Sequence, residues 1–77
     1  MIKMKIRLDT ISKVKEFDKT TRLYSGDKLI IKQGEFTIDA YSIMGIMSLN
    51  NLEDMYLYYE KEYCDEAVLM FGKWEVK

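Results

Sequence analysis

The strict alternation of apolar and basic side chains over residues 2–8 constrains the fold more than any other feature of the sequence. Its apolar members are Ile2, Met4, Ile6 and Leu8. Its basic members are Lys3, Lys5 and Arg7. Because neighbouring side chains of a β-strand point to opposite faces, the pattern predicts a strand with one buried face and one face in water. The sheet that contains this strand should therefore be open on one side.

The apolar spacing changes to a helical repeat over residues 11–24. The apolar stripe of this segment consists of Ile11, Val14, Phe17, Thr21 and Tyr24. The spacing predicts a helix with one side toward the core, and the hydroxyl of Thr10 or of Ser12 would cap its start. Gly26 follows the last apolar residue, so we expect a left-handed helix stop there.

Five further elements complete the chain. Two strands, a short helix, a strand and a final helix are predicted, in that order, over residues 28–32, 36–40, 42–49, 55–59 and 62–75, with Ser42 as the cap of the short helix. The glycine-containing segment 33–35 would join the first two of them as a hairpin. The order βαββαβα predicts an α+β fold, an open-faced β-sandwich with helices on one face of a four-stranded antiparallel sheet. We expect a single domain over residues 1–77.

The overall composition is typical of a globular protein, and we find no signal that would target the chain outside the cytoplasm. No apolar run approaches the roughly 20 residues of a membrane helix, so no membrane partner is expected. The single cysteine excludes an internal disulfide, which makes a reducing, cytoplasmic location the default. Residues 1–32 carry nine Lys and Arg against four Asp and Glu, and the remainder carries three against nine. Charge complementarity within the fold is the favoured explanation, and a basic surface for an acidic partner is the alternative.

The side-chain inventory argues against an enzyme. There is no histidine, which removes the usual general base and the commonest transition-metal ligand. Cys64 has acidic sequence neighbours and no positive partner to favour the thiolate, so we interpret it as an inert thiol. The carboxylate pairs at 53–54 and 65–66 are sequence neighbours typical of a solvated loop and a helix start. We therefore expect no catalytic residue, no metal site and no cofactor.

One segment carries a family resemblance. Residues 42–49, Ser-Ile-Met-Gly-Ile-Met-Ser-Leu, resemble the regulatory-serine segment of HPr, the histidine-containing phosphocarrier of the bacterial sugar phosphotransferase system. In that family the segment forms the short second helix, and a dedicated HPr kinase phosphorylates its first serine in low-GC Gram-positive bacteria. The predicted element order is also that of HPr. The strand ending 38–40, the aromatic Tyr24 and the acidic start at 65–67 are similar to the family's pattern.

The chain departs from HPr at the residues that carry phosphate. The family's phosphohistidine opens its first helix, and an ungapped count from Tyr24 places Thr10 at that position. Ser12 and Lys13 fall where the family has arginine and proline. A threonine hydroxyl lacks the basic nitrogen needed for a reversible phosphoryl relay, so this chemistry is not expected. Tyr41 also replaces the basic residue that precedes the family's serine.

The resemblance implies a regulatory or protein-interaction module without phosphohistidine chemistry, similar to HPr paralogues that lack the histidine. It would be phosphorylated on Ser42 and would bind a phosphotransferase-system or catabolite-control protein, with HPr kinase as a further partner. By the resemblance, the contact residues would be Ile43, Met44 and Met47, because so short a helix cannot bury all its apolar side chains. The alternative within the resemblance is a degenerate paralogue with an unrelated protein-binding role.

A function of another class is suggested by the exposed face of the predicted sheet. Its basic and aromatic residues would be Lys3, Lys5, Arg7, Tyr56 and Tyr58. In the HPr arrangement the first and last strands are neighbours, so these side chains would share one surface. Single-stranded nucleic acid binds such surfaces by base stacking and phosphate contact. No RNA-recognition motif is present, and cross-strand Tyr–Lys packing is ordinary in sheets, so nucleic acid is the less favoured partner.

Overall fold

The computed structural model describes residues 1–76, which form one open sheet and three helices. The strands are β1 (Ile2–Ile6), β2 (Leu29–Gln33), β3 (Phe36–Asp39) and β4 (Met55–Tyr59). The α-helices are α1 (Ile11–Thr21), α2 (Ile43–Met47) and α3 (Cys64–Phe71). Two short 3₁₀ helices flank α3, namely η1 (Lys61–Tyr63) and η2 (Gly72–Trp74).

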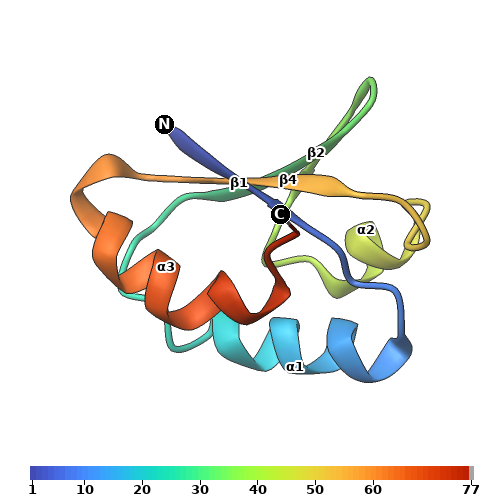
Figure 1. Cartoon of the computed structure of the whole chain (residues 1–77), viewed down its shortest axis with the longest axis horizontal. Helices are drawn as coiled ribbons and strands as arrows, with labels where there is room; N and C mark the ends of the chain where they lie inside the picture. The colour runs from blue at the N-terminus through green and yellow to red at the C-terminus, as the bar shows by residue number, and fades with distance from the viewer. Residues whose placement is uncertain (77) are drawn as a thin grey trace.

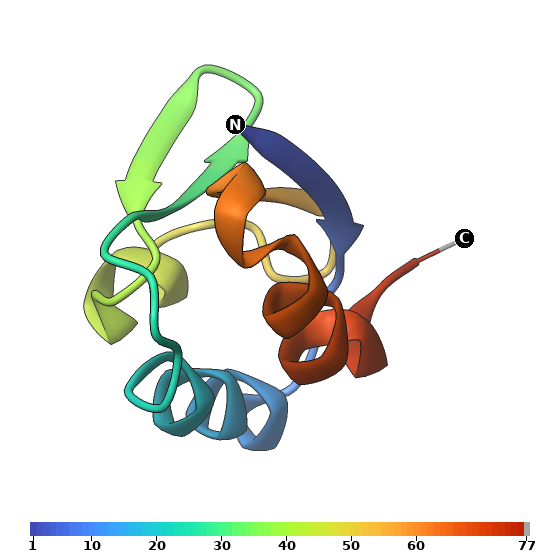
Figure 2. The same ribbon diagram turned by 90° about the vertical axis from the view of Figure 1, so that its left-hand side faces the viewer.

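The four strands form one antiparallel sheet in the order β1-β4-β2-β3. All three α-helices lie on the same side of this sheet, and none of residues 1–76 forms a helix on the other side (Figure 1). Figure 2 shows α1 and α3 below the sheet, with α2 beside them under the β2–β3 hairpin. The predicted α+β class with an open four-stranded antiparallel sheet is confirmed.

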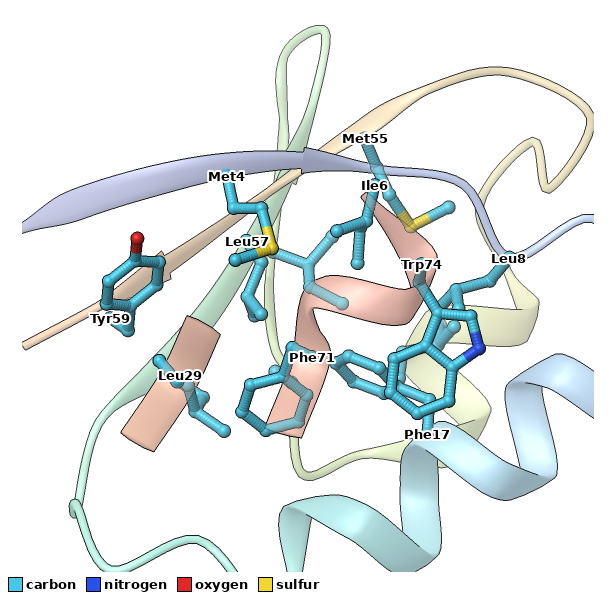
Figure 3. Close-up of a cluster of buried hydrophobic side chains, with 14 of the residues drawn as sticks. Met4, Ile6, Leu8, Phe17, Leu29, Met55, Leu57, Tyr59, Phe71 and Trp74 are labelled. Carbon is cyan, nitrogen blue, oxygen red and sulfur yellow. The ribbon is translucent and has the colours of Figure 1, made fainter. Parts of the chain in front are cut away.

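The core fills the space between the sheet and the helices. Met4 of β1 pairs with Leu57 of β4, which in turn pairs with Ile31 of β2, and all three side chains are buried. Met55 and Tyr59 are buried on the same face, as the alternation of β4 predicts. Met4, Met55 and Leu57 point from the strands toward the aromatic residues of the helical layer (Figure 3). The apolar alternation thus sets which face of the sheet is covered.

An aromatic cluster joins the helical elements to one another. The ring of Phe71 lies 5.3 Å from that of Phe17, 5.7 Å from that of Tyr24 and 6.3 Å from that of Trp74, measured between centroids. Phe17 and Trp74 meet edge to face at 5.4 Å. Figure 3 shows Phe17, Phe71 and Trp74 gathered beneath the strands. Phe71 is therefore the centre of the packing between α1, α3 and η2.

Residues 74–76 lie along the outer edge of β1. The amide of Val76 donates to the carbonyl of Lys5 at 2.8 Å, and the amide of Arg7 donates to the carbonyl of Trp74 at 3.1 Å. Ile6 and Glu75 form an isolated antiparallel bridge. The last part of β1 is thus covered on the side away from β4.

Several predicted boundaries are wrong by a few residues. The first strand ends at Ile6 instead of residue 8, and α1 ends at Thr21 instead of residue 24. The amides of Leu23 and Tyr24 bond to carbonyls three residues earlier, so the chain tightens into a turn after Thr21. The single helix predicted over 62–75 is divided into η1, α3 and η2. Amides at both of its ends bond to carbonyls three residues earlier, which gives 3₁₀ turns there.

The expected left-handed helix stop at Gly26 is wrong. Among residues 1–76 only Gly34, in the β2–β3 turn, has a positive φ, at 58°. Gly26 is needed because the side chains of Tyr24 and Glu60 approach its backbone closely. A Cβ atom there would lie 2.5 Å from Cε2 of Tyr24 and 2.8 Å from Oε1 of Glu60.

Candidate functional site

Helix α2 begins with a serine cap, as predicted. Ser42 has extended backbone angles, and its Oγ accepts from the amide of Gly45 at 3.2 Å. The carbonyl of Ser42 accepts the first helical bond, from Ile46, at 3.1 Å. Ser48 ends the helix, and its own hydroxyl donates to the carbonyl of Gly45 at 2.6 Å. Hydroxyls at both ends therefore replace bonds that a five-residue helix cannot make for itself.

The apolar side chains of α2 divide between core and surface. Ile46 is fully buried, and Leu49 just after the helix is nearly so. Met44 is 80% exposed and Met47 is 51% exposed, whereas Ile43 is half-buried against the core. The expectation that a short apolar helix leaves methionines at the surface is confirmed. Of the three predicted contact residues, Met44 and Met47 are exposed to solvent, and Ile43 is only partly exposed.

Thr10 occupies the start of α1 and serves as its N-cap. Its Oγ1 accepts from the amide of Lys13 at 3.1 Å. Lys13 also forms an ion pair with Asp9 at 2.8 Å, and this hydrogen bond holds the pKa of the Asp9 carboxyl below its ordinary value. Thr10 and Ser12 are both exposed, and Thr10 was one of two caps that the sequence left open. A hydroxyl engaged in helix capping next to an ion pair offers no basic nitrogen for a phosphoryl group.

A small cavity of about 130 Å³ connects the start of α1 to the end of α2. It is lined by Asp9, Thr10, Ile11, Val14, Met47 and Asn51. Ile11 is 62% exposed, so its predicted place on the buried stripe of the helix is wrong. It lies in the first turn of α1. We call Ile11, Met44 and Met47 the docking patch.

The hydroxyl of Ser42 lies at the surface in an acidic setting. The amide of Ser42 donates to the carbonyl of Asp39 at 3.0 Å, and the carboxylate of Asp39 accepts from the amide of Tyr41 at 2.9 Å. The phenol of Tyr41 donates to the carbonyl of Gly26 at 2.9 Å. Burial, with Asp27 and Asp39 nearby, raises the pKa of this phenol. The residue before the serine therefore anchors the chain and supplies no positive charge.

The exposed sheet face holds the predicted basic and aromatic residues, except for Arg7. Lys3 lies opposite Tyr58 and Lys5 opposite Tyr56 in the β1–β4 register. Arg7 follows the end of β1 and is occupied by a 2.8 Å ion pair with Asp54. The sequence reasoning missed Lys32, which pairs with Tyr56 from β2. The sequence does contain a signal for Lys32. Leu29 and Ile31 are buried, and side chains alternate along a strand, so Lys32 must lie on the exposed face together with residue 30.

A turn between α1 and β2 is held by two carboxylates from distant elements. Oε1 of Glu60 accepts from the amides of Asp27 and Lys28 at 2.9 and 3.0 Å. Oε2 of Glu66 accepts from the amide of Ser25 at 2.6 Å. The buried hydroxyl of Tyr24 lies in this region without a hydrogen-bond partner in residues 1–76. Burial first, and then the charge of Glu60, raises the pKa of Tyr24 to about 12.

Three further features concern metal binding, the cysteine and membrane insertion, and all are stated for the described residues. Over residues 1–76, no three carboxylate, cysteine or histidine side chains gather closely enough to hold a metal ion. Cys64 is half-buried at the start of α3. No helix within those residues has both the length and the apolar character needed to cross a membrane.

Comparison with known proteins returns no relative: no family model, no curated protein and no solved structure matches the chain. The resemblance to HPr therefore stays an expectation from the sequence, carried by residues 42–49 and by the predicted order of elements. A functional argument for this chain has to start from its surfaces.

Proposed function

We propose that this chain is an HPr-like module without phosphohistidine chemistry, which acts by binding another protein through the docking patch. In this proposal it belongs to the cytoplasmic sugar phosphotransferase and catabolite-regulation machinery of a bacterium and catalyses no reaction. The observation that carries the proposal is the exposure of Met44 and Met47, at 80% and 51%, on the segment that resembles the regulatory helix of HPr.

The arrangement of the chain supports the resemblance. Strand β1 lies beside β4, as in the HPr arrangement, and Ser42 opens a short second helix. The three side chains of the docking patch come from the two helical segments at one end of the helical layer. Methionine adapts its shape to a partner surface, and burying such a side chain contributes about 1.5–3 kcal/mol. The two exposed methionines and Ile11 would thus supply the apolar centre of an interface, and the residues around them would supply the rest of its area.

The partner chemistry follows from the composition of the patch. Its three side chains are apolar, so the facing surface of the partner should be apolar as well. The ion pair between Asp9 and Lys13 lies at its rim and would set orientation more than affinity. A phosphotransferase-system protein or a catabolite-control repressor is the expected partner.

We expect Met44→Asp to weaken binding to such a partner by at least about tenfold, because a carboxylate would be buried without a counter-charge. Leu69→Asp is the matched control, since Leu69 is 86% exposed on α3, outside the patch. Affinity would be measured with purified first enzyme of the phosphotransferase system and with purified repressor, by chemical-shift titration of the labelled chain. Shifts should concentrate at residues 43–47 and at Ile11. Unmoved resonances there with both proteins would reject the regulatory role.

Ser42 is the proposed switch of this surface. Its hydroxyl is exposed and lies two residues before Met44. Transfer of the γ-phosphoryl group of ATP to its Oγ would release ADP and a proton, and would leave a dianion beside the patch and close to Asp39. That charge would oppose an apolar partner and favour a basic one.

Incubation with HPr kinase and ATP should add one phosphoryl group to Ser42, read by mass spectrometry of the digested chain. Ser42→Asn is the appropriate control, because asparagine retains a helix cap and removes the hydroxyl. Labelling of Ser48, or equal labelling of the Ser42→Asn chain, would contradict this assignment. Failure of phosphorylation alone would leave the docking role standing and remove its switch.

A further inference from the structure

Basic and aromatic residues lie on the open face of the sheet. The helices lie on the other face (Figure 1). We call the basic and aromatic surface the platform, and it consists of Lys3, Lys5, Lys32, Tyr56 and Tyr58. In the strand register Lys5, Tyr56 and Lys32 form one row, and Lys3, Tyr58 and Ile30 form the next. The two tyrosines thus lie at the middle of the sheet, with lysines on both sides.

We infer that the platform binds single-stranded nucleic acid, with bases stacked on Tyr56 and Tyr58 and phosphates held by the three lysines. This function is separate from the docking patch, which lies in the helical layer.

Charge complementarity points to a polyanion. Three ammonium groups share this face although the whole chain has a net charge of −1. Among the described residues, Asp54 beside the platform is paired with Arg7, which lowers its effect on the lysines. Asp39 lies on the edge strand β3, where it pairs with Ile30 of β2. The middle rows therefore present positive charge to an approaching chain of phosphates.

The tyrosines give the surface its preference for bases. Tyr56 is 38% exposed, and Tyr58 is partly exposed beside it. The Nζ of Lys3 lies 4.8 Å from the ring centroid of Tyr56, and the Nζ of Lys32 lies 4.8 Å from that of Tyr58. Each lysine thus holds its ammonium next to a ring that a base could cover. Stacking of a base is the stronger of the two contacts, so a bound strand would displace the ammonium toward a phosphate.

Single-stranded nucleic acid fits these features better than two other polyanions. A duplex keeps its bases stacked on one another and would contact only the lysines. An acidic polypeptide would also engage the lysines and leave the rings unused. A requirement for the tyrosines therefore separates the proposed ligand from both.

The test is fluorescence anisotropy of a labelled oligouridine and a labelled oligothymidine with the whole chain, at salt concentrations from about 50 to 200 mM. We expect binding that weakens as salt rises. Replacing Lys3 and Lys32 by glutamine should lower the slope of log affinity against log salt by about 0.7 for each lysine. Replacing Lys15 and Lys19, which are exposed on α1, should leave the slope unchanged.

The Tyr56→Val and Tyr58→Val chains test the stacking. Valine keeps the strand propensity, so circular dichroism should remain that of the parent chain. Each substitution should weaken oligonucleotide binding by at least about fivefold while leaving the salt slope in place. If folded valine variants bind as well as the parent, the rings do not read bases and the inference is wrong. Equal binding of a duplex or of polyglutamate, absence of binding at the lowest salt, or an equal loss with the α1 lysines would also overturn it.

Discussion

Phe71→Ala is expected to lower the free energy of unfolding by about 3–5 kcal/mol. Phe71 is fully buried and contacts three other aromatic rings, so its removal leaves a cavity that none of the helices can close alone. A domain of this size has a total stability of roughly 5–15 kcal/mol, which makes that loss a large fraction. Urea unfolding followed by far-ultraviolet circular dichroism would measure it.

Leu69→Ala provides the control two residues away in the same helix. Leu69 is exposed, and the change keeps good helix propensity, so stability should stay within about 0.5 kcal/mol of the parent. Comparable losses from both substitutions would mean that α3 packs on a different face from the one described here.

The parent chain should lose stability between pH 10 and pH 12, and Tyr24→Phe is expected to make that loss smaller by about 2–3 kcal/mol. The pKa of Tyr24 is raised to about 12 in the fold, chiefly by burial, from an ordinary value of 10.0. Between these values the folded chain retains a proton that the unfolded chain has lost. Stability from this group is therefore complete below pH 10 and falls as the pH rises to 12.

The measurement is urea unfolding of both chains at neutral pH and at steps up to pH 12. Burial also raises the pKa values of Tyr41 and Tyr59, so both chains should lose stability and the difference between them is the informative quantity. At neutral pH the variant should be at least as stable as the parent, because the buried Tyr24 hydroxyl makes no hydrogen bond with residues 1–76. Parallel pH curves would show that this hydroxyl is hydrated in solution.

Much of the fold could be predicted because its signals are local. The alternation in residues 2–8 and 55–59 correctly predicts the buried faces of β1 and β4, and a serine before an apolar run correctly predicts the cap of α2. The errors occur where tertiary packing decides. The role of Gly26 depends on Tyr24 and Glu60, and Glu60 is more than thirty residues away in the sequence. No pattern around residue 26 could show that approach.

The candidate sites were predictable to different degrees. Exposure of Met44 and Met47 follows from counting apolar residues on a helix too short to bury them. Lys32 could have been found from the phase of its strand. Exposure of Ile11 could not, because helical spacing shows which side a residue is on and does not show whether the core extends to that turn. The unpartnered hydroxyl of Tyr24 likewise depends on packing that only the folded chain shows.

The coverage of β1 by residues 74–76 has a consequence for self-association. A sheet can grow into a long assembly only if each molecule has two accessible edge strands, so that it can pair with a neighbour on both sides. Residues 74–76 occupy the last part of the β1 edge, which leaves β3 as the edge strand available along its length. Self-association through strand edges should therefore favour β3, and contact between two β3 edges would join a pair of molecules.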